Sequence, residues 1–207
     1  MVNRNQLPKL LLGVSLGLLL FSLSGLIWLN WRIREASSNR NIPLPVLTHL
    51  PDFRLIETSG TPFGLADLKD KIWVADFIFT RCPGPCPRMS ARMAELLRRF
   101  AAEPSVRLVS ISVDPEFDTP EILSRYGATF HADENRWIFL TGEKAEIHRL
   151  AKSGFLVGGV DDVMMHSTRF ILVDRNAQVR GYYDSADEQS LQGLVRDIGV
   201  LVAEKPL

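Results

Sequence analysis

The two cysteines of this chain lie four positions apart, at Cys82 and Cys86, in the stretch RCPGPCPRMS. Residues at i and i+4 share one side of a helical turn, so the two sulfurs can converge on one point. Two converging thiols can bind a soft metal ion or exchange electrons with a disulfide. A purely structural disulfide is the weaker interpretation, because closing so short a loop constrains the unfolded chain little.

Prolines surround both cysteines, at Pro83, Pro85 and Pro87. Each removes a backbone donor and restricts φ, so the stretch predicts a rigid loop that enters a helix. Cys86 is then expected at the positive end of that helix, which lowers the pKa of a thiol. The resulting thiolate is both the nucleophile and the metal-binding form of cysteine.

A metal site needs more than two sulfurs, and the chain offers four histidines, at positions 49, 131, 148 and 166. We expect the first three to be uninvolved, since they fall in polar or charged segments. His166 differs, because VMMHSTRFILVD places it just before a buried strand, where a thioredoxin-like fold brings the preceding loop against the helix start. Two thiolates and one imidazole form a soft three-coordinate site that suits copper(I), or copper(II) with a further weak ligand. Structural zinc normally requires four protein ligands, and no second cysteine pair exists.

The elements that must position these residues alternate between strands and helices. Apolar, β-branched and aromatic runs predict buried strands at 71–79, 106–113 and 137–140. The first of these leads directly into the cysteine turn. Helical spacing then predicts helices after that turn, from Pro120 toward 126 behind an N-cap at Thr119, and near 143–152.

The carboxyl-terminal part of the sequence predicts a hairpin and a last helix. The runs at 168–173 and 179–183 flank the turn DRNA, and Ser185 with Glu188 forms a candidate capping box. Strand–helix alternation that ends in a hairpin and a helix is typical of a thioredoxin-like α/β domain.

An apolar segment precedes this domain. Residues 10–29 contain no charge and are long enough to cross a hydrocarbon core of roughly 30 Å as a helix, with Trp28 and Trp31 near its end. A cleaved signal peptide would be shorter and would end in a small-x-small site. We therefore expect an N-terminal segment with a transmembrane helix at 1–31, a tether at 32–50 and a thioredoxin-like domain at 51–207.

The charge of the chain excludes one class of partner. It carries 24 basic and 24 acidic residues and no long basic run, so nucleic acid is not an expected partner. Basic residues flank the apolar segment on both sides, and the positive-inside rule gives no orientation for it.

Several motifs together resemble the Sco/SenC family, the membrane-anchored copper proteins of cytochrome c oxidase assembly. They are FTRCPGPCP at 79–87, SVDPEFDTP at 112–120, FLTG at 139–142 and HSTRFILVD at 166–174, behind an N-terminal anchor and tether. A lone C-x-x-x-C pattern would be weak, but this combination is specific.

The resemblance implies a copper chaperone whose ligands are Cys82, Cys86 and His166, on a thioredoxin domain with an inserted hairpin. It implies delivery of copper to the copper-accepting subunit of cytochrome c oxidase, from the periplasmic side of a bacterial inner membrane. One departure concerns Gly84, followed by Pro85. The family commonly has an acidic residue directly after the first Cys-Pro, so this chain lacks a negative charge beside the metal.

The main alternative is a thiol–disulfide oxidoreductase that acts on a partner's cysteines and is served by a thiol reductant protein. Three residues separate the cysteines rather than the two of thioredoxins, and MMHST occupies the stretch where thioredoxins place a cis-proline. A peroxidase of the peroxiredoxin type needs a threonine three residues before the reactive cysteine, whereas Thr80 is two before Cys82. A non-enzymatic redox or copper sensor stays open.

Three acids stand at alternate positions in the second motif, at Asp114, Glu116 and Asp118. Carboxylate oxygens suit magnesium or calcium rather than a sulfur site. We expect these acids to end a strand and cap a helix.

Overall fold

The computed structural model describes residues 17–18, 21–30, 43–157 and 168–204, which fall into two compact units, Met1–Pro43 and Leu44–Leu207. In the first unit residues 21–30 are helical and expose apolar side chains such as Phe21 and Ile27. Much of the predicted membrane span lies outside the described residues. Within the described ranges, no helix has the length and apolar character needed to cross a membrane.

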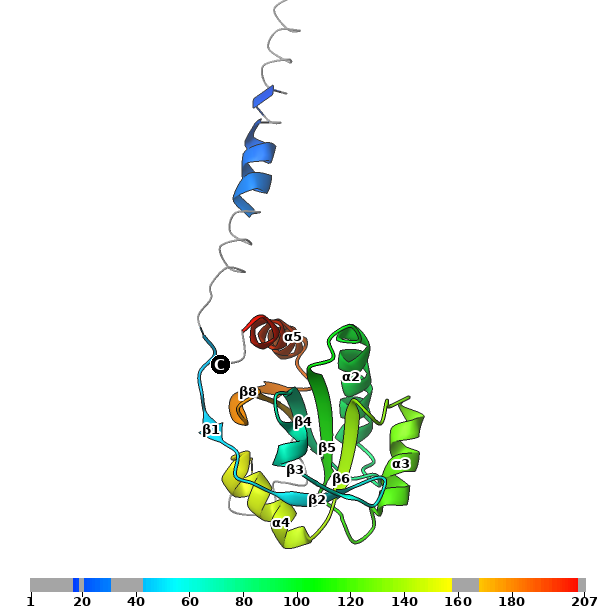
Figure 1. Ribbon diagram of the computed structural model, residues 1–207. Coiled ribbons are helices and arrows are strands. Elements are labelled where there is room, and N and C mark those ends of the chain that lie inside the picture. The colour runs from blue at the N-terminus through cyan, green and yellow to red at the C-terminus, as the bar shows by residue number, and fades with distance from the viewer. Residues whose placement is uncertain (1–16, 19–20, 31–42, 158–167, 205–207) are drawn as a thin grey trace, which may run out of the picture. The chain divides into compact units, whose positions relative to one another are not determined.

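The second unit is built on one eight-stranded sheet, in which parallel strands occupy the centre (Figure 1). The strand order is β1-β8-β7-β4-β5-β6-β2-β3. Strands β4, β5 and β6 run parallel, and the hairpin β7–β8 joins β4 in the antiparallel direction. The bounds are β1 Thr48–His49, β2 Arg54–Glu57, β3 Pro62–Gly64, β4 Ile72–Ile78, β5 Val106–Ser112, β6 Trp137–Thr141, β7 Arg169–Val173 and β8 Gln178–Asp184.

Helices cover both faces of this sheet. Helices α2 and α5 pack on one face and α4 on the other (Figure 1). Their bounds are α2 Pro85–Arg99, α3 Pro120–Thr129, α4 Lys144–Arg149 and α5 Glu188–Ala203, with a 3₁₀ turn η1 at Leu65–Leu68 and a π-helical turn η2 at Leu150–Gly154. The order β4-α2-β5, followed by a hairpin and α5, is the predicted thioredoxin-like arrangement.

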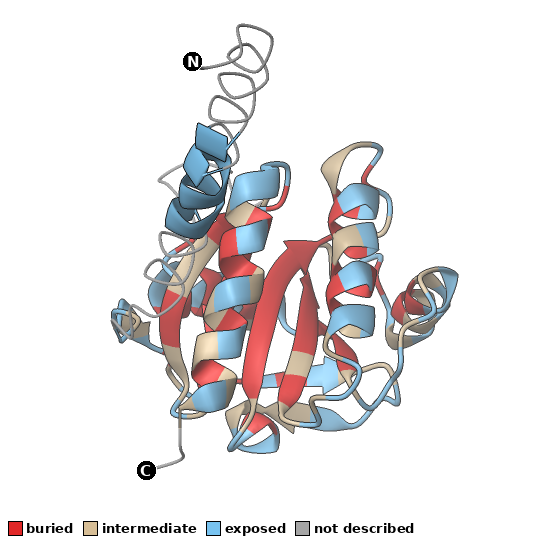
Figure 2. Cartoon of the chain, turned by 90° about the horizontal axis from the view of Figure 1, so that it is seen from above, coloured by how far each residue is buried: buried red, intermediate tan, exposed pale blue. Residues whose placement is uncertain are grey.

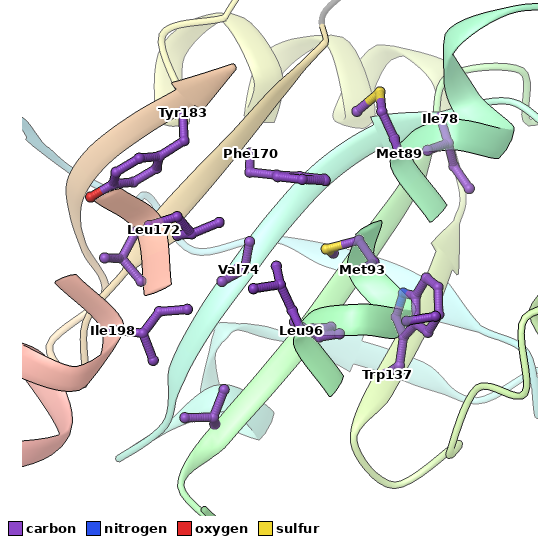
Figure 3. Packing of buried hydrophobic residues seen from close by; sticks show 14 of the residues in the cluster. Val74, Ile78, Met89, Met93, Leu96, Trp137, Phe170, Leu172, Tyr183 and Ile198 are labelled. Atoms are coloured by element: carbon purple, nitrogen blue, oxygen red, sulfur yellow. The ribbon is translucent and has the colours of Figure 1, made fainter. Parts of the chain in front are cut away.

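Strand β4 is the centre of two hydrophobic cores, and all seven of its residues are buried. Burial on both faces explains why its sequence is a nearly continuous apolar run rather than an alternating one. On one face Val74 belongs to the core that includes Met93 and Leu96 of α2 (Figure 3). On the other face Trp73 lies edge-on to Phe155, with ring centroids 5.7 Å apart. Figure 2 shows the buried strands between exposed helix surfaces.

The predicted hairpin is confirmed, but the predicted start of the last helix is wrong. Asp187, not Ser185, is the N-cap of α5, and its carboxylate accepts a hydrogen bond from the Ser190 N–H at 2.8 Å. Ser185 donates its own N–H to the Thr168 carbonyl and so still belongs to the hairpin. The prediction for α3 is confirmed, since Thr119 caps it and accepts a hydrogen bond from the Ile122 N–H.

Residues 44–50 of the predicted tether belong to the folded unit. Thr48 and His49 form β1, which pairs with β8. The buried guanidinium of Arg180 donates to the carbonyls of Leu44 at 2.6 Å and Pro45 at 3.2 Å, and to Asp174 at 2.6 Å. A buried cation needs all its donors satisfied, and the chain before β1 supplies two of the acceptors.

We predict that Arg180→Ala lowers the free energy of unfolding by about 3–5 kcal/mol, because it leaves the Asp174 carboxylate buried without its cation. Urea unfolding of the chain measures this loss, and hydrogen exchange at 44–50 should increase at the same time. Arg169→Ala, which removes an exposed arginine from β7, is the matched control. Equal losses for the two variants would contradict the proposed role of Arg180.

Candidate metal centre

The cysteine turn joins the carboxyl end of β4 to the first turn of α2. Both cysteines are buried free thiols. The Cys82 N–H donates to the Phe79 carbonyl at 3.1 Å, which closes a tight turn directly after the strand. Helix α2 begins at Pro85, with Gly84 as its N-cap, so Cys86 lies in the first helical turn as predicted. The turn before the helix, rather than helical i, i+4 spacing, brings the two thiols into hydrogen-bonding contact.

The sulfur of Cys82 lies at the amide end of α2. Burial by itself would raise the pKa of Cys82, and hydrogen bonds from the backbone N–H groups of Cys86 and Gly84 act against it. The Cys86 thiol and the positive charge of Arg88 act in the same direction, so the pKa of Cys82 falls below its ordinary value. Hydrogen bonds to the charged form favour that form, and Cys82 is therefore the thiol prepared to act as a thiolate.

Cys86 behaves in the opposite way. Burial, helped by the neighbouring Cys82 and Asp76, raises its pKa to about 12 against the lowering effect of a hydrogen bond to the Phe79 backbone. The expectation that the helix start would lower the pKa of Cys86 is wrong, because its burial outweighs the influence of the helix. The backbone amides of that first turn serve the sulfur of Cys82 instead.

A buried carboxylate behind Cys86 was missed by the sequence analysis. Asp76 on β4 is fully buried, and Ser110 donates to one of its oxygens at 2.6 Å while Trp137 donates to Ser110 at 2.9 Å. The other oxygen has no hydrogen-bond partner among the described residues. Burial raises the pKa of Asp76 to about 7, against the lowering effect of Ser110. A single acid inside the apolar run KIWVADFIF was the signal in the sequence.

The three acids of the second motif hold loops together. Asp114 pairs with Arg81 at 2.6 Å and Glu116 with Lys144 at 3.2 Å, while Asp118 accepts hydrogen bonds from Thr80. Across the part of the chain that the structure describes, no three histidine, cysteine or acidic residues are grouped as metal ligands. Because Thr119 caps α3, these acids are not helix caps either, and two of them contact the residues just before Cys82.

The predicted site is thus partly assembled. The structure brings Cys82 and Cys86 together, whereas His166 lies outside the described residues and stays a prediction. The remaining histidines, His49, His131 and His148, are exposed and lie in β1, after α3 and in α4. Two adjacent sulfurs are the donor set that copper(I) prefers, so the described residues fit a soft metal ion.

The fold and this site define a thioredoxin-like protein with a pair of adjacent buried thiols. Residues 45–199 match the family model described as SCO1/SenC, and the chain belongs to that family. The SCO1 protein homolog of Bacillus subtilis is 31% identical over 169 residues, which cover 79% of this chain and 88% of that protein.

Solved structures agree with this assignment. BsSco, described as a member of the Sco family of cytochrome c oxidase assembly proteins with a disulfide switch, is 30% identical with a TM-score of 0.69, over 78% of this chain and 99% of that chain. ScoI of Bradyrhizobium japonicum, whose structure has copper bound, is 26% identical with a TM-score of 0.59, over 72% of this chain and 99% of that chain.

We predict that iodoacetamide alkylates Cys82 well before Cys86 at neutral pH, because only Cys82 has a lowered pKa. Cys86→Ala should raise the pKa of Cys82 and slow its alkylation, since the variant removes one hydrogen bond to its thiolate. Mass spectrometry of the fully reduced chain across a pH series measures both effects. Preferential labelling of Cys86 would contradict the assignment of the lowered pKa to Cys82.

Asp76 predicts a specific dependence of stability on pH. Its pKa rises from 3.8 to about 7 on folding, so the folded protein binds the extra proton between these values. Stability from this group is therefore complete below the lower value and is lost as the pH rises through about 7. Between about pH 5 and about pH 8 the free energy of unfolding of the unaltered chain should fall by about 1–3 kcal/mol more than that of Asp76→Asn. Denaturant unfolding of both reduced proteins measures the difference, and parallel pH profiles would refute it.

Proposed function

We propose that this protein is a membrane-anchored copper chaperone that binds copper through Cys82, Cys86 and His166 and delivers it to the copper centre of cytochrome c oxidase. The observation that carries the proposal is the pair of hydrogen-bonded thiols at the start of α2, in a chain of the SCO1/SenC family. The copper-bound ScoI structure of a relative supports copper as the cargo.

The unequal thiols suit reversible loading. The Cys82 sulfur is already favoured as a thiolate, whereas Cys86 holds its proton until a metal ion replaces it. Uptake of copper therefore releases a proton from Cys86. A site with only two sulfurs and one imidazole leaves room for a ligand from the acceptor, so copper can pass by ligand exchange.

The position of His166 in the sequence supports its role as third ligand. It stands three residues before β7, which pairs with β4, the strand that leads into Cys82. The start of β7 therefore lies beside the strand that leads into the thiols. Imidazole is a common partner of thiolate in copper sites.

The anchor and the compartment belong to the same proposal. Residues 10–29 form the transmembrane helix, and the helical residues 21–30 with their exposed apolar side chains support it. The thioredoxin-like domain then faces the periplasmic side of a bacterial inner membrane. There it would meet the copper-accepting subunit of the oxidase and a thiol reductant protein, which keeps the pair reduced for copper.

A second candidate function is thiol–disulfide exchange with a partner protein, and the opposed pKa shifts favour it. The Cys82 thiolate would attack a partner disulfide, and Cys86 would then resolve the mixed disulfide with its own sulfur. The partner leaves with two thiols and this protein with one disulfide. The disulfide switch described for BsSco supports redox chemistry at such a pair.

We predict that the reduced chain in detergent binds one copper(I) per molecule under anaerobic conditions, in competition with a chromogenic chelator. Cys82→Ser and Cys86→Ser should each weaken binding by at least roughly 100-fold, and His166→Ala by about tenfold or more, because each variant removes a ligand. His131→Ala is the matched control, since it removes an exposed histidine that follows α3.

The outcomes separate the two functions. Loss of affinity in all three ligand variants, with His131→Ala unchanged, supports the chaperone. An unchanged copper affinity in His166→Ala would show that His166 is not a ligand. Weak binding by the unaltered chain would overturn the chaperone function, and the pair would then be assayed for reduction of a peptide disulfide.

A further inference from the structure

The segment that leads into Cys82 is held from the side by the loop between β5 and α3. Thr80 donates its backbone N–H to one oxygen of the Asp118 carboxylate at 3.1 Å and its hydroxyl to the other at 2.5 Å. The Ser112 hydroxyl, at the end of β5, donates to the same carboxylate at 2.5 Å. We call Thr80, Ser112 and Asp118 the Thr80 clamp.

The clamp is a costly arrangement that local structure does not explain. Asp118 is fully buried, and within the described ranges its carboxylate accepts hydrogen bonds only from neutral donors and forms no ion pair. Burying a carboxylate without a cation costs free energy unless its hydrogen bonds are well satisfied. Because Thr119 caps α3, Asp118 is not needed for that helix.

The geometry connects the clamp to Cys82. Thr80 lies inside the tight turn in which the Cys82 N–H donates to the Phe79 carbonyl. Both the N–H and the hydroxyl of Thr80 are held by Asp118, so this turn cannot shift without breaking two hydrogen bonds to a buried charge. Cys86, in contrast, is held by the backbone of α2. The position of the Cys82 sulfur therefore depends on the Thr80 clamp as well as on the hydrogen bonds from the Gly84 and Cys86 amides.

A second contact at the surface is weaker. Arg81 pairs with Asp114 and lies over the Phe117 ring at 4.1 Å, but its side chain is 58% exposed. Exposed ion pairs contribute little to stability because solvent screens them. The buried hydrogen bonds of Asp118 therefore dominate over the contacts of Arg81.

We propose that Asp118, acting through Thr80, is a positioning residue that holds the Cys82 sulfur at the distance from Cys86 needed for joint action of the two thiols. The inference deepens the proposed function, because joint binding of copper needs the same placement. It also applies to the thiol pair alone, since disulfide formation depends on the effective concentration of one thiol at the other.

The test measures the equilibrium constant for formation of the Cys82–Cys86 disulfide, without copper. In a glutathione buffer, one glutathione disulfide and the two protein thiols give the protein disulfide and two glutathione thiols. We expect Thr80→Val, which removes the clamped hydroxyl and keeps the volume, to lower this equilibrium constant at least about tenfold. Thr80→Ser restores the hydroxyl and should return the constant to within about twofold of the unaltered chain. Asp118→Asn should act in the same direction as Thr80→Val.

The matched control is Thr141→Val, at the end of β6, which pairs with β5. Thr141 is buried, and its hydroxyl has no hydrogen-bond partner in the described part of the chain. The same substitution there removes a buried hydroxyl without breaking a hydrogen bond. The constant should stay unchanged. An equal effect of Thr141→Val, or no effect of Thr80→Val in a folded protein, overturns the proposal. If Asp118→Asn does not fold, the Thr80 variants decide.

A copper titration of the same variants separates the two proposals. Thr80→Val should weaken copper binding about tenfold if the chain is a chaperone. If the unaltered chain binds no copper while the disulfide constant still falls in Thr80→Val, the chaperone function fails and the clamp stands. If copper binds and the disulfide constant does not respond, the clamp fails and the chaperone function stands.

Discussion

The hydrogen bonds that reach the Cys82 sulfur are the interaction on which this site depends. They come from the backbone amides of Gly84 and Cys86 and from the Cys86 thiol, and together they favour a thiolate on a largely buried sulfur. The arrangement requires a strand that ends abruptly, a turn that folds back at once and a helix that begins within three residues. The prolines make that local path rigid, and β4, buried on both faces, fixes where it starts.

Burial gives the two thiols different roles. Both lie near the start of the same helix, so the helix dipole alone would favour thiolate at both. Burial and the charge of Asp76 keep the proton on Cys86, while the amide donors reach the sulfur of Cys82. For a metal carrier this provides one ligand that is ready and one whose deprotonation is coupled to binding. For a thiol reductase the same difference separates the attacking sulfur from the resolving one.

The connections around the turn show how a small α/β domain builds a site at the ends of parallel strands. Thr80 follows β4 and Asp118 follows β5, and the parallel pairing of these strands brings the two loops together. The acids that resemble metal ligands in the sequence therefore hold a loop in place. The soft donors of the site are the two adjacent thiols, and the nearby carboxylates fix the loop that precedes Cys82.

The sequence by itself determined the thioredoxin-like fold, the cysteine turn and the membership of the copper-protein family. Apolar runs, proline positions and short motifs are local properties, and local properties can be recognised in a sequence. Only the tertiary structure decided which thiol has the lowered pKa, that Asp76 is buried behind Cys86, and that Asp118 serves Thr80 rather than a helix cap. These outcomes depend on burial and on contacts between segments 34 or more residues apart, such as Asp76 with Ser110 and Thr80 with Asp118, which no local pattern encodes.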